Sequence, residues 1–445
     1  MSGSRALYSL LVLLALPWLS LVVWWRSLRE RHYAQGWAAR FGAGAALAGY
    51  QRSIWLHAVS VGEVQAAAPL LSALHAQFPT MALSITSATP AGRERARALA
   101  ITTSSTGTGA SAGIDVRYAP YDLGLCVRGS LRRLRPKLLV IMETELWPNL
   151  LAECAAARVP VLIASARLSE RSLQRLRRFP GLFQPALRAT VTVAAQSAAD
   201  AQRFAALGVP AARLSVCGNI KFDRTPGMQL RAAGAALRAC FAPARLLWVA
   251  GSTHEGEEQA ALNAHRALRA AGAMGAARCA EALLVLAPRH RPRFDAVAQL
   301  LDASGLPWLR YSDAAAAGAE QCGRAAVVLL DTIGDLESFY AAADMAFVGG
   351  SLVPVGGHNL LEPAALGVPS ICGPHMSAAA QVAKELSASG ATRMVAAPEQ
   401  FTAALLELAA DETRRRAMSA AALAVVAANR GALESLLLLI KAQLA

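Results

Sequence analysis

Two segments of this 445-residue chain place carboxylates directly after apolar runs that have the pattern of buried strands. In the first segment, His57-Ala-Val-Ser-Val-Gly-Glu63, Ser60 and Glu63 have the S-x-x-E spacing of a helix capping box. Glu63 also lies where a strand ends and a helix begins, so its carboxylate is a candidate general base. Both interpretations stay open, and one residue is able to serve both roles.

The second segment, Glu143-Thr-Glu145-Leu-Trp-Pro148, follows an expected strand at Lys137–Met142. Pro148 suits the first turn of a helix. The alternative interpretation is therefore that the carboxylates only precede that helix. Ligands of doubly wound sheets bind at the carboxyl ends of the strands, which favours a functional role for Glu143 or Glu145. Lys221, in the segment GNIKFD, is a candidate partner for a phosphate or carboxylate, and a solvated lysine is the alternative.

Residues 344–376 are rich in glycine and predict a site for a nucleotide's phosphate or ribose. The apolar run Met345–Val348 predicts a strand, and Asn359 and Glu362 have the spacing of a helix start, which Gly367 ends. The residues between strand and helix include Gly349, Gly350, Gly356 and Gly357. Free backbone N–H groups and the helix dipole at such a turn attract anions. An ordinary glycine-rich turn is the alternative.

Two further turns resemble this one. The segment GSTHEGE (251–257) leads from a strand into an acidic first helical turn, and APRHRPR (287–293) follows the next strand. Arginine suits phosphate because its planar fork binds two oxygens. Since the three turns meet at one edge of a parallel sheet, together they predict a nucleotide site.

Strand-length apolar runs alternate with helical segments along the chain. The first series is Ile54–Val59, Met81–Thr86, Lys137–Met142, Val159–Ala164, Thr190–Ala195 and Leu214–Gly218. The second is Leu246–Ala250, Ala282–Ala287, Trp308–Tyr311, Ala326–Leu330, Met345–Val348 and Pro369–Cys372. Two such series predict an α/β chain with two Rossmann-like parallel-sheet domains facing a cleft. We expect ligands in that cleft, beyond the strands' carboxyl ends.

The alternation is interrupted near Asp223–Arg238, where we place the domain boundary. The expected organisation is an anchor at 1–30, a first domain at 31–222, a linker at 223–238, a second domain at 239–430 and a terminal helix at 431–445. The low-complexity stretch 102–113, TTSSTGTGASAG, predicts a mobile surface loop. The last helix is very apolar and must pack on something, with the first domain as one option.

The uncharged stretch Tyr8–Trp25 has the minimum length of a membrane span. Four arginines follow it within 15 residues and one precedes it, so the positive-inside rule predicts a single N-terminal anchor with the remainder in the cytoplasm. A cleaved signal peptide is the alternative, weakened by the absence of a small-residue cleavage site. Pro17 leaves open a helix that lies in one leaflet.

The formal net charge of +14 favours an anionic membrane surface as a partner. Nucleic acid is disfavoured, because no binding motif or interleaved aromatic residues accompany the basic ones. An exposed basic helix face is predicted at Arg171, Arg175 and Arg178, either solvated or facing an anionic lipid or phosphorylated acceptor. Seven scattered cysteines and unpaired histidines indicate reduced thiols in a cytosolic compartment and no metal site.

Eight motifs, spread in order over nearly the whole chain, resemble those of the 3-deoxy-D-manno-octulosonic acid (Kdo) transferases of lipopolysaccharide assembly. They are LHAVSVGEV, METELWPNL, ASARLSERS, GNIKFD, GSTHEGEE, PRHRPRF, DTIGDL and FVGGSLVPVGGHNLLEPAALGVP. The resemblance implies a GT-B glycosyltransferase without a cofactor, anchored by its N-terminus at the cytoplasmic face of the inner membrane. It implies transfer of Kdo from CMP-Kdo to the lipid A precursor (lipid IVA).

The same resemblance implies roles for single residues. Glu63 would be the general base, and Glu143 and Lys221 would stabilise the transition state. CMP would be held by Pro288, Arg289, Ile333, Gly334, Asp335, Asn359, Leu360, Leu361 and Glu362. The chain departs from the family in reading TIGDL for TMGEL, so that Asp335 replaces a longer carboxylate, and in replacing a TFNF segment at 376–379.

Elementary chemistry is consistent with this reading. The leaving phosphate of CMP needs cationic and N–H stabilisation, which Arg289 and the helix at Asn359 would supply without a metal. A base on the opposite side of the sugar gives inversion. The rivals are a GT-B transferase or epimerase that uses a UDP-sugar, and a non-catalytic nucleotide-sensing or membrane-docking protein. A dehydrogenase is disfavoured because no G-x-G-x-x-G opens a helix after a strand.

Overall fold

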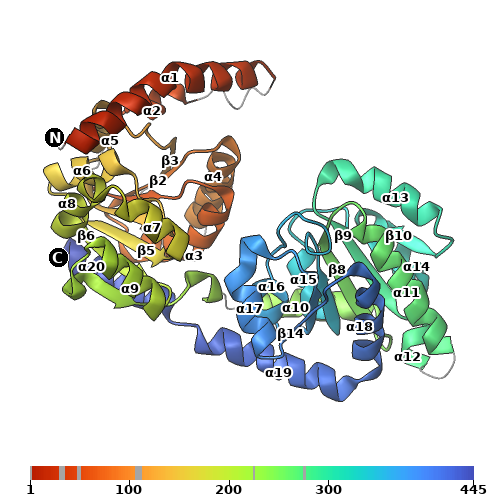
Figure 1. Ribbon diagram of the computed structural model, residues 1–445. Coiled ribbons are helices and arrows are strands. Elements are labelled where there is room, and N and C mark those ends of the chain that lie inside the picture. Colours follow the sequence, from red (N-terminus) through yellow and green to blue (C-terminus); the bar gives the residue numbers. More distant parts are fainter. Residues whose placement is uncertain (1–2, 30–35, 48–51, 106–112, 224–225, 274–276) are drawn as a thin grey trace. The chain divides into compact units, whose positions relative to one another are not determined.

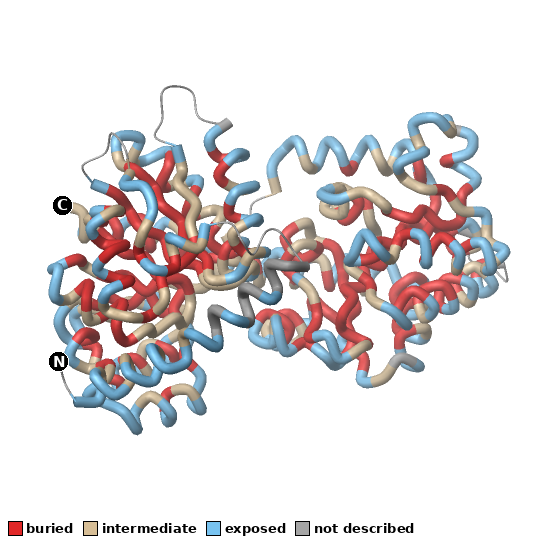
Figure 2. The backbone as a smooth tube through the Cα atoms, turned by 90° about the horizontal axis from the view of Figure 1, so that it is seen from above, coloured by how far each residue is buried: buried red, intermediate tan, exposed pale blue. Residues whose placement is uncertain are grey.

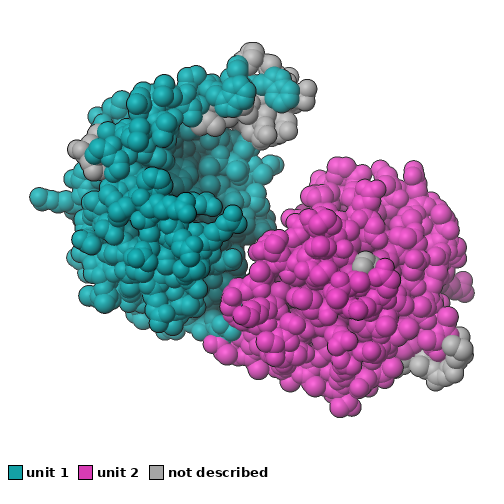
Figure 3. Space-filling view, viewed as in Figure 1, with its two compact units in different colours: residues 1–223, 429–445 teal, residues 224–428 magenta. Residues whose placement is uncertain are grey.

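Two seven-stranded sheets, each with all strands parallel, organise the chain (Figure 1). The computed structural model describes residues 3–29, 36–47, 52–105, 113–223, 226–273 and 277–445. Figure 3 colours its two compact units, which comprise residues 1–223 with 429–445 (unit 1) and residues 224–428 (unit 2). Two parallel-sheet α/β domains are therefore confirmed.

The sheet of unit 1 has the strand order β3-β2-β1-β4-β5-β6-β7. Its strands are β1 (Ser53–His57), β2 (Ala82–Ser87), β3 (Ile114–Tyr118), β4 (Pro136–Met142), β5 (Val161–Ala166), β6 (Val191–Ala195) and β7 (Leu214–Val216). The order reverses between β1 and β4, which is the topological switch point where doubly wound sheets bind ligands.

The sheet of unit 2 has the order β10-β11-β9-β8-β12-β13-β14 and reverses between β8 and β12. Its strands are β8 (Leu247–Thr253), β9 (Leu283–Pro288), β10 (Trp308–Arg310), β11 (Val327–Leu329), β12 (Met345–Val348), β13 (Ser370–Cys372) and β14 (Thr392–Met394). The turns that follow β8 and β12 are two of the glycine-rich turns identified in the sequence.

Helices connect the strands of each unit. Those of unit 1 are α1 (Gly3–Arg29), α2 (Trp37–Arg40), α3 (Val61–Gln77), α4 (Pro90–Ser105), α5 (Gly124–Leu134), α6 (Pro148–Ala156), α7 (Glu170–Arg177), α8 (Pro180–Thr190), α9 (Ala198–Leu207) and α20 (Ala432–Leu444). Those of unit 2 are α10 (Met228–Phe241), α11 (Glu257–Ala273), α12 (Ala277–Ala280), α13 (Phe294–Asp302), α14 (Ala314–Arg324), α15 (Leu336–Ala342), α16 (Leu361–Ala365), α17 (Ala380–Ala388), α18 (Pro398–Ala410) and α19 (Glu412–Ala428). Short 3₁₀ turns are η2 (Ala211–Arg213), η3 (Ile220–Phe222), η4 (Arg291–Arg293), η5 (Tyr311–Asp313) and η6 (Ser377–Ala379).

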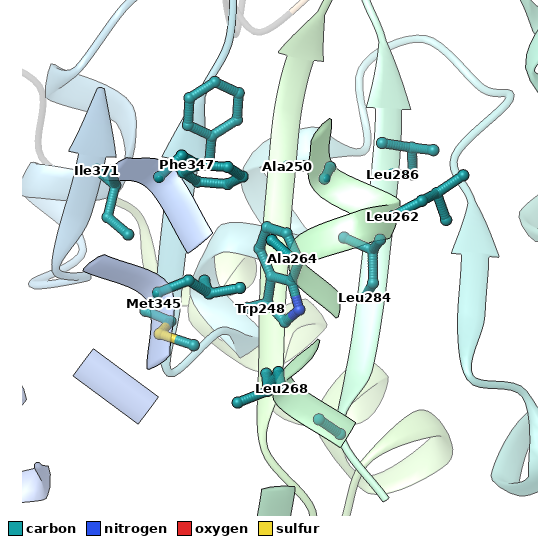
Figure 4. Packing of buried hydrophobic residues seen from close by; sticks show 14 of the residues in the cluster. Trp248, Ala250, Leu262, Ala264, Leu268, Leu284, Leu286, Met345, Phe347 and Ile371 are labelled. Carbon is teal, nitrogen blue, oxygen red and sulfur yellow. The ribbon is translucent and has the colours of Figure 1, made fainter. Parts of the chain in front are cut away.

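The central strands are buried along nearly their whole length, because helices cover both faces of a parallel sheet (Figure 2). In unit 2, Trp248, Leu284 and Phe347 come from three neighbouring strands and belong to one core cluster with Leu262 and Leu268 of α11 (Figure 4). Trp248 satisfies its buried ring N–H by donating to His265 Nδ1 at 3.1 Å. These apolar layers fix the strand ends that carry the polar turns.

Two strands were missed by the sequence prediction, β3 and β14, and both lie at the edge of a sheet. β3 carries Asp115 and Arg117, which pair with each other, and β14 is three residues long with Arg393 and Met394 exposed. Charged and short strands are typical of sheet edges, where they discourage aggregation.

Helix α10 occupies most of the range 223–238 in which we expected a linker, because Gly234 and Phe241 pack it into unit 2. Of the low-complexity stretch, 102–105 belong to α4 and 106–112 lie outside the described residues.

The C-terminal helix packs on the first domain. The side chains of Leu436, Leu437 and Ile440 in α20 are buried in a core cluster of unit 1, and Asp223 accepts hydrogen bonds from the N–H groups of Gly431 and Leu433 at its start. Among the described residues, 412–444 is the helical stretch long and apolar enough to cross a membrane. It is broken between α19 and α20, where Gly431 has φ 99°, and its buried side belongs to the protein core.

Helix α1 is present where an N-terminal anchor was expected, but its apolar part, Gly3–Trp18, is too short to count as a span. The helix contacts α6 and α8 of unit 1. Tyr8 donates to Asp122 Oδ2 at 2.9 Å, and Ser9 lies 3.1 Å from the side-chain amide of Asn149. Most of its described leucines face solvent, as do two of its tryptophans. These exposed side chains are Leu7, Leu10, Leu11, Leu13, Leu14, Trp18, Leu21 and Trp25.

Candidate functional site

Glu63 and Ser60 cap the start of α3 in a variant of the capping box, in which Glu63 accepts from the N–H of Val59. The backbone N–H of Glu63 donates to Ser60 Oγ at 3.3 Å, and its Oε2 accepts from the N–H of Val59 at 2.8 Å. The hydroxyl of Ser60 donates to Oε1 at 3.0 Å. The capping interpretation is therefore confirmed, and these bonds hold the carboxylate at the carboxyl end of β1.

The same carboxylate is half-buried, and burial raises the pKa of Glu63 to about 7. Hydrogen bonds from Val59 and Ser60 oppose this rise, whereas the negative charges of Glu145 and Glu143 add to it. A carboxylate with a pKa near neutrality is poised to accept a proton at physiological pH. Glu63 thus combines a structural cap with a raised pKa.

Glu143 and Lys221 form an ion pair, with Lys221 Nζ 2.6 Å from Glu143 Oε1. Glu143 follows β4 and has φ 56°, a left-handed conformation that side chains other than glycine rarely adopt. Its N–H donates to the carbonyl of Ala164 at 3.0 Å, which keeps it tied to β5. Lys221 lies in η3, whose Ile220 and Phe222 are buried. Strained residues of this kind gather at functional sites.

A second carboxylate in this loop is held by an aromatic residue. Trp147 donates its ring N–H to Glu145 Oε2 at 2.7 Å. The Trp147 ring meets that of His57 edge-on, with centroids 4.7 Å apart. His57 is fully buried, and burial lowers its pKa to about 3. His57 is therefore a neutral core residue that supports the loop after β4.

In unit 2 an internal carboxylate takes up part of the backbone N–H groups that the glycine-rich turn was expected to offer to an anion. The fully buried carboxylate of Glu257 accepts hydrogen bonds from the N–H groups of Gly350 at 2.7 Å, Ser351 at 3.0 Å and Leu352 at 2.9 Å. It also accepts from the N–H of His254 at 2.9 Å. Glu257 thus clamps the turn after β12 to the turn after β8.

The predicted phosphate ligand Arg289 is exposed directly after β9, and its N–H donates to the carbonyl of Thr253 at 3.0 Å. Pro288 is buried as the last residue of that strand. Ile333 and Gly334 are exposed, and Asp335 begins α15 and accepts a hydrogen bond from Thr332 Oγ1 at 2.5 Å. Pro288 and Arg289 lie at the end of β9 and the other three residues follow β11, its neighbour in the sheet, so both groups lie at the same edge.

The predicted segment 359–362 splits into two kinds of residue. The side chains of Leu360 and Leu361 are buried, so only their backbone remains for a ligand. Asn359 is exposed, caps the helix by accepting from the N–H of Leu361 at 3.1 Å, and donates to Glu362 Oε1 at 3.2 Å. Helix α16 is five residues long, shorter than the sequence suggested, and ends at Ala365, two residues before Gly367, which has φ 73°.

The sequence analysis missed a pair of histidines at the switch point of unit 2. His254, after β8, and His358, after β12, lie with their Nε2 atoms 2.8 Å apart. Burial lowers the pKa of His358 to about 4 and also lowers that of His254. His290 meets His254 edge-on, with ring centroids 5.4 Å apart. The sequence does indicate that each histidine follows a strand at the same sheet edge. The spacing of the histidines along the chain, however, does not indicate that they meet.

Comparison with known sequences gives concordant results. A family model described as 3-deoxy-D-manno-octulosonic-acid transferase (kdotransferase) matches residues 35–224. The 3-deoxy-D-manno-octulosonic acid transferase of Haemophilus influenzae is 34% identical over 98% of this chain and 98% of its own. The protein of that name from Bordetella pertussis is 38% identical over 94% of this chain and 95% of its own.

Comparison with solved structures supports the fold. A putative UDP-N-acetylglucosamine 2-epimerase from Listeria monocytogenes matches 88% of this chain and 96% of its own, with a TM-score of 0.52. At 15% identity this likeness shows a shared two-domain GT-B-like fold and nothing about substrate.

Proposed function

The chain belongs to the Kdo transferase family of glycosyltransferases, and on that premise we propose that it moves Kdo from CMP-Kdo to the lipid A precursor of lipopolysaccharide with inversion at the anomeric carbon. The observation that best supports this mechanism is Glu63, a half-buried carboxylate with a pKa near 7 at the switch point of unit 1. Unit 1 would bind the acceptor, and unit 2 would bind the donor.

The reaction asks for a base and for stabilisation of charge. Glu63 accepts the proton of the attacking acceptor hydroxyl as the new bond to the anomeric carbon forms. The bond between that carbon and the phosphate oxygen of CMP breaks in the same step, on the opposite face, so the configuration inverts. Glu143 and Lys221 stabilise the charges that develop on the acceptor side, since a pre-formed ion pair needs little reorganisation.

The donor site is proposed in unit 2. Arg289 binds the phosphate of CMP with its exposed guanidinium, and Pro288 shapes the same turn. Asn359 and Glu362 bind ribose hydroxyls, with Leu360 and Leu361 contributing backbone groups alone. Ile333, Gly334 and Asp335 contact the base or sugar from the neighbouring turn. Protein groups neutralise the single phosphate in this scheme.

Membrane attachment through the N-terminus is the third part of the proposal. Helix α1 docks on unit 1 through polar contacts of Tyr8 and Ser9, and its exposed leucines and tryptophans form an apolar surface. Burying such a surface in lipid is favourable, and the arginines that follow in the sequence suit an anionic cytoplasmic leaflet. We place α1 at the inner membrane, with both units on its cytoplasmic side.

One experiment tests the proposed activity. The purified full-length chain is incubated with CMP-Kdo and tetra-acylated lipid A precursor, and the product is weighed by mass spectrometry. We expect the acceptor mass to rise by one or more Kdo residues. No mass gain with CMP-Kdo, in a preparation that binds CMP, would contradict the proposal.

A UDP-sugar transferase or epimerase is the second candidate, because one fold can serve different substrates. The same assay with UDP-N-acetylglucosamine separates the two. Turnover of the UDP-sugar in place of CMP-Kdo would support the alternative.

A further inference from the structure

The histidine pair at the switch point of unit 2 has no role in the steps above. The rings of His254 and His358 have planes 6° apart, and their Nε2 atoms face each other at 2.8 Å. This separation is that of a hydrogen bond, so one Nε2 donates and the other accepts. The pair links the turn after β8 to the turn after β12, beside the clamp made by Glu257.

Basic side chains surround the pair. Arg289 and His290 act electrostatically on both rings, and Arg293 acts on His254, with Glu257 as the carboxylate acting in the opposite sense. The oxygens of Glu257 are occupied by four backbone N–H groups. Among the described residues, no three His, Cys, Asp or Glu side chains are arranged to hold a metal ion. A cluster of cationic and neutral N–H donors is the chemistry that recognises an anion.

The protonation state of the two histidines decides how well the pair binds an anion. In the neutral pair, the ring that accepts at Nε2 carries its proton on Nδ1, and the other ring presents a bare Nδ1. One additional proton places N–H groups on both Nδ1 atoms and adds a positive charge shared across the bridge. Without an anion, burial and the neighbouring arginines disfavour that proton. A bound anion acts in the opposite direction and favours that proton.

We propose that His254 and His358 form a subsite for the phosphate of the donor nucleotide, and that the pair takes up one proton from solvent when this phosphate binds. The inference rests on the proposed function, because it takes a cytidine monophosphate ester as the ligand. When the sugar leaves, the negative charge on the phosphate grows, and the protonated pair stabilises it next to Arg289. Gly350 is required at this point, because a Cβ there would lie 2.9 Å from the His358 ring and its φ is 66°.

Isothermal titration calorimetry of the full-length chain tests the proposal. CMP and cytidine are titrated at pH 7 in several buffers of different ionisation enthalpy, which yields the number of protons taken up. For wild type we expect an uptake approaching one proton with CMP and close to zero with cytidine. In His254→Asn and His358→Asn we expect CMP affinity to fall by about tenfold or more, loss of the uptake, and unchanged cytidine affinity. His375→Asn, an exposed histidine of the same unit, is the matched control.

The outcomes separate the two proposals. If wild type takes up almost no proton on binding CMP, the histidine subsite is overturned whatever the variants do. It is also overturned if both variants bind CMP as tightly as wild type does. Failure of wild type to bind either CMP or cytidine contradicts the proposed function itself. Unchanged cytidine binding shows that a variant has kept its fold, and His254→Gln and His358→Gln replace any variant that has not.

Discussion

Lys221 Nζ lies 2.6 Å from Glu143 Oε1, although the two residues are 78 positions apart in the sequence. The contact joins η3 to the strained residue that follows β4. Both side chains retain partial exposure, 37% for Lys221 and 23% for Glu143, so the pair remains accessible to a ligand. Exposed ion pairs contribute little to stability, which favours a functional reason for this one.

We therefore expect Lys221→Met and Glu143→Gln each to lower kcat by roughly 10²–10³, the usual cost of removing a group that stabilises charge in a transition state. Because the two residues act together, the double variant should lose little more than either single variant. Steady-state kinetics of the four proteins gives the coupling, with Lys441→Met on α20 as a control lysine. Fully additive losses would mean that the pair does not act as one unit.

For the proposed base, Glu63→Gln should reduce kcat by roughly 10²–10⁴. Glutamine keeps an oxygen to accept from the N–H of Val59 but cannot take a proton, so thermal stability should change little. Glu170→Gln is a matched control, because Glu170 also lies in a first helical turn behind a capping serine, on the surface of α7. If Glu63→Gln kept near-full turnover at saturating acceptor, the role of Glu63 would be that of a helix cap alone.

The pH dependence follows from the same carboxylate. Since Glu63 must be ionised to act and its pKa is raised to about 7, kcat should rise with pH through an apparent pKa near 7. Glu145→Gln removes a negative charge that raises this pKa, so the rising limb should move to lower pH. The profile is measured at saturating substrates for wild type and variant. If the rising part of the profile stays at the same pH in the variant, or moves to higher pH, its apparent pKa does not belong to Glu63.

The sequence predicted the fold well where burial sets the pattern. Twelve of the fourteen strands were identified, because central parallel strands are continuous apolar runs. β3 and β14 were not predicted, because an edge strand needs fewer apolar residues than a central strand. The capping role of Glu63 was visible because S-x-x-E is a local signal. Contacts such as Lys221 with Glu143 were not, because the topology of the sheet creates them.

The glycine-rich turn shows the limit of local patterns. The sequence correctly indicated a turn with unusual backbone conformations, and Gly350 and Gly357 do have positive φ. It did not reveal that Glu257, nearly a hundred residues earlier, would occupy the N–H groups of that turn. The proposed donor site therefore relies more on side chains after the strands, such as Arg289 and the histidine pair, than on the N–H groups of residues 350–352.

For the donor site we expect Arg289→Ala and Glu362→Ala each to weaken CMP binding, by about 1.5–3 kcal/mol for a lost charge-assisted hydrogen bond. The Michaelis constant for the lipid acceptor should change less. Calorimetric titration with CMP measures the effect, and Arg416→Ala, on the surface of α19, is the control. Unchanged CMP affinity in both variants would move the nucleotide site elsewhere.

Deleting residues 1–30 should leave CMP binding intact and impair work on membrane-borne acceptor. Helix α1 makes polar contacts with unit 1 through Tyr8 and Ser9, but Asp122 keeps its hydrogen bonds from the N–H groups of Asn149 and Leu150 without it. The body of unit 1 should therefore stay folded, which CMP titration and circular dichroism will check. What the deletion removes is the exposed apolar surface of the helix.

Liposome flotation of the full-length and truncated chains, at low and high salt, separates apolar from electrostatic attachment. The exposed arginines Arg171, Arg175 and Arg178 add an electrostatic contribution, which high salt screens. The full-length chain should float at both salt concentrations, and the truncated chain should float weakly at low salt and remain at the bottom at high salt. Helix α20 does not offer a substitute anchor, because Leu436 and Ile440 are buried in unit 1. If the truncated chain floats as well as the full-length chain at high salt, the N-terminal segment is not the main anchor, and α20 must leave that core to reach lipid.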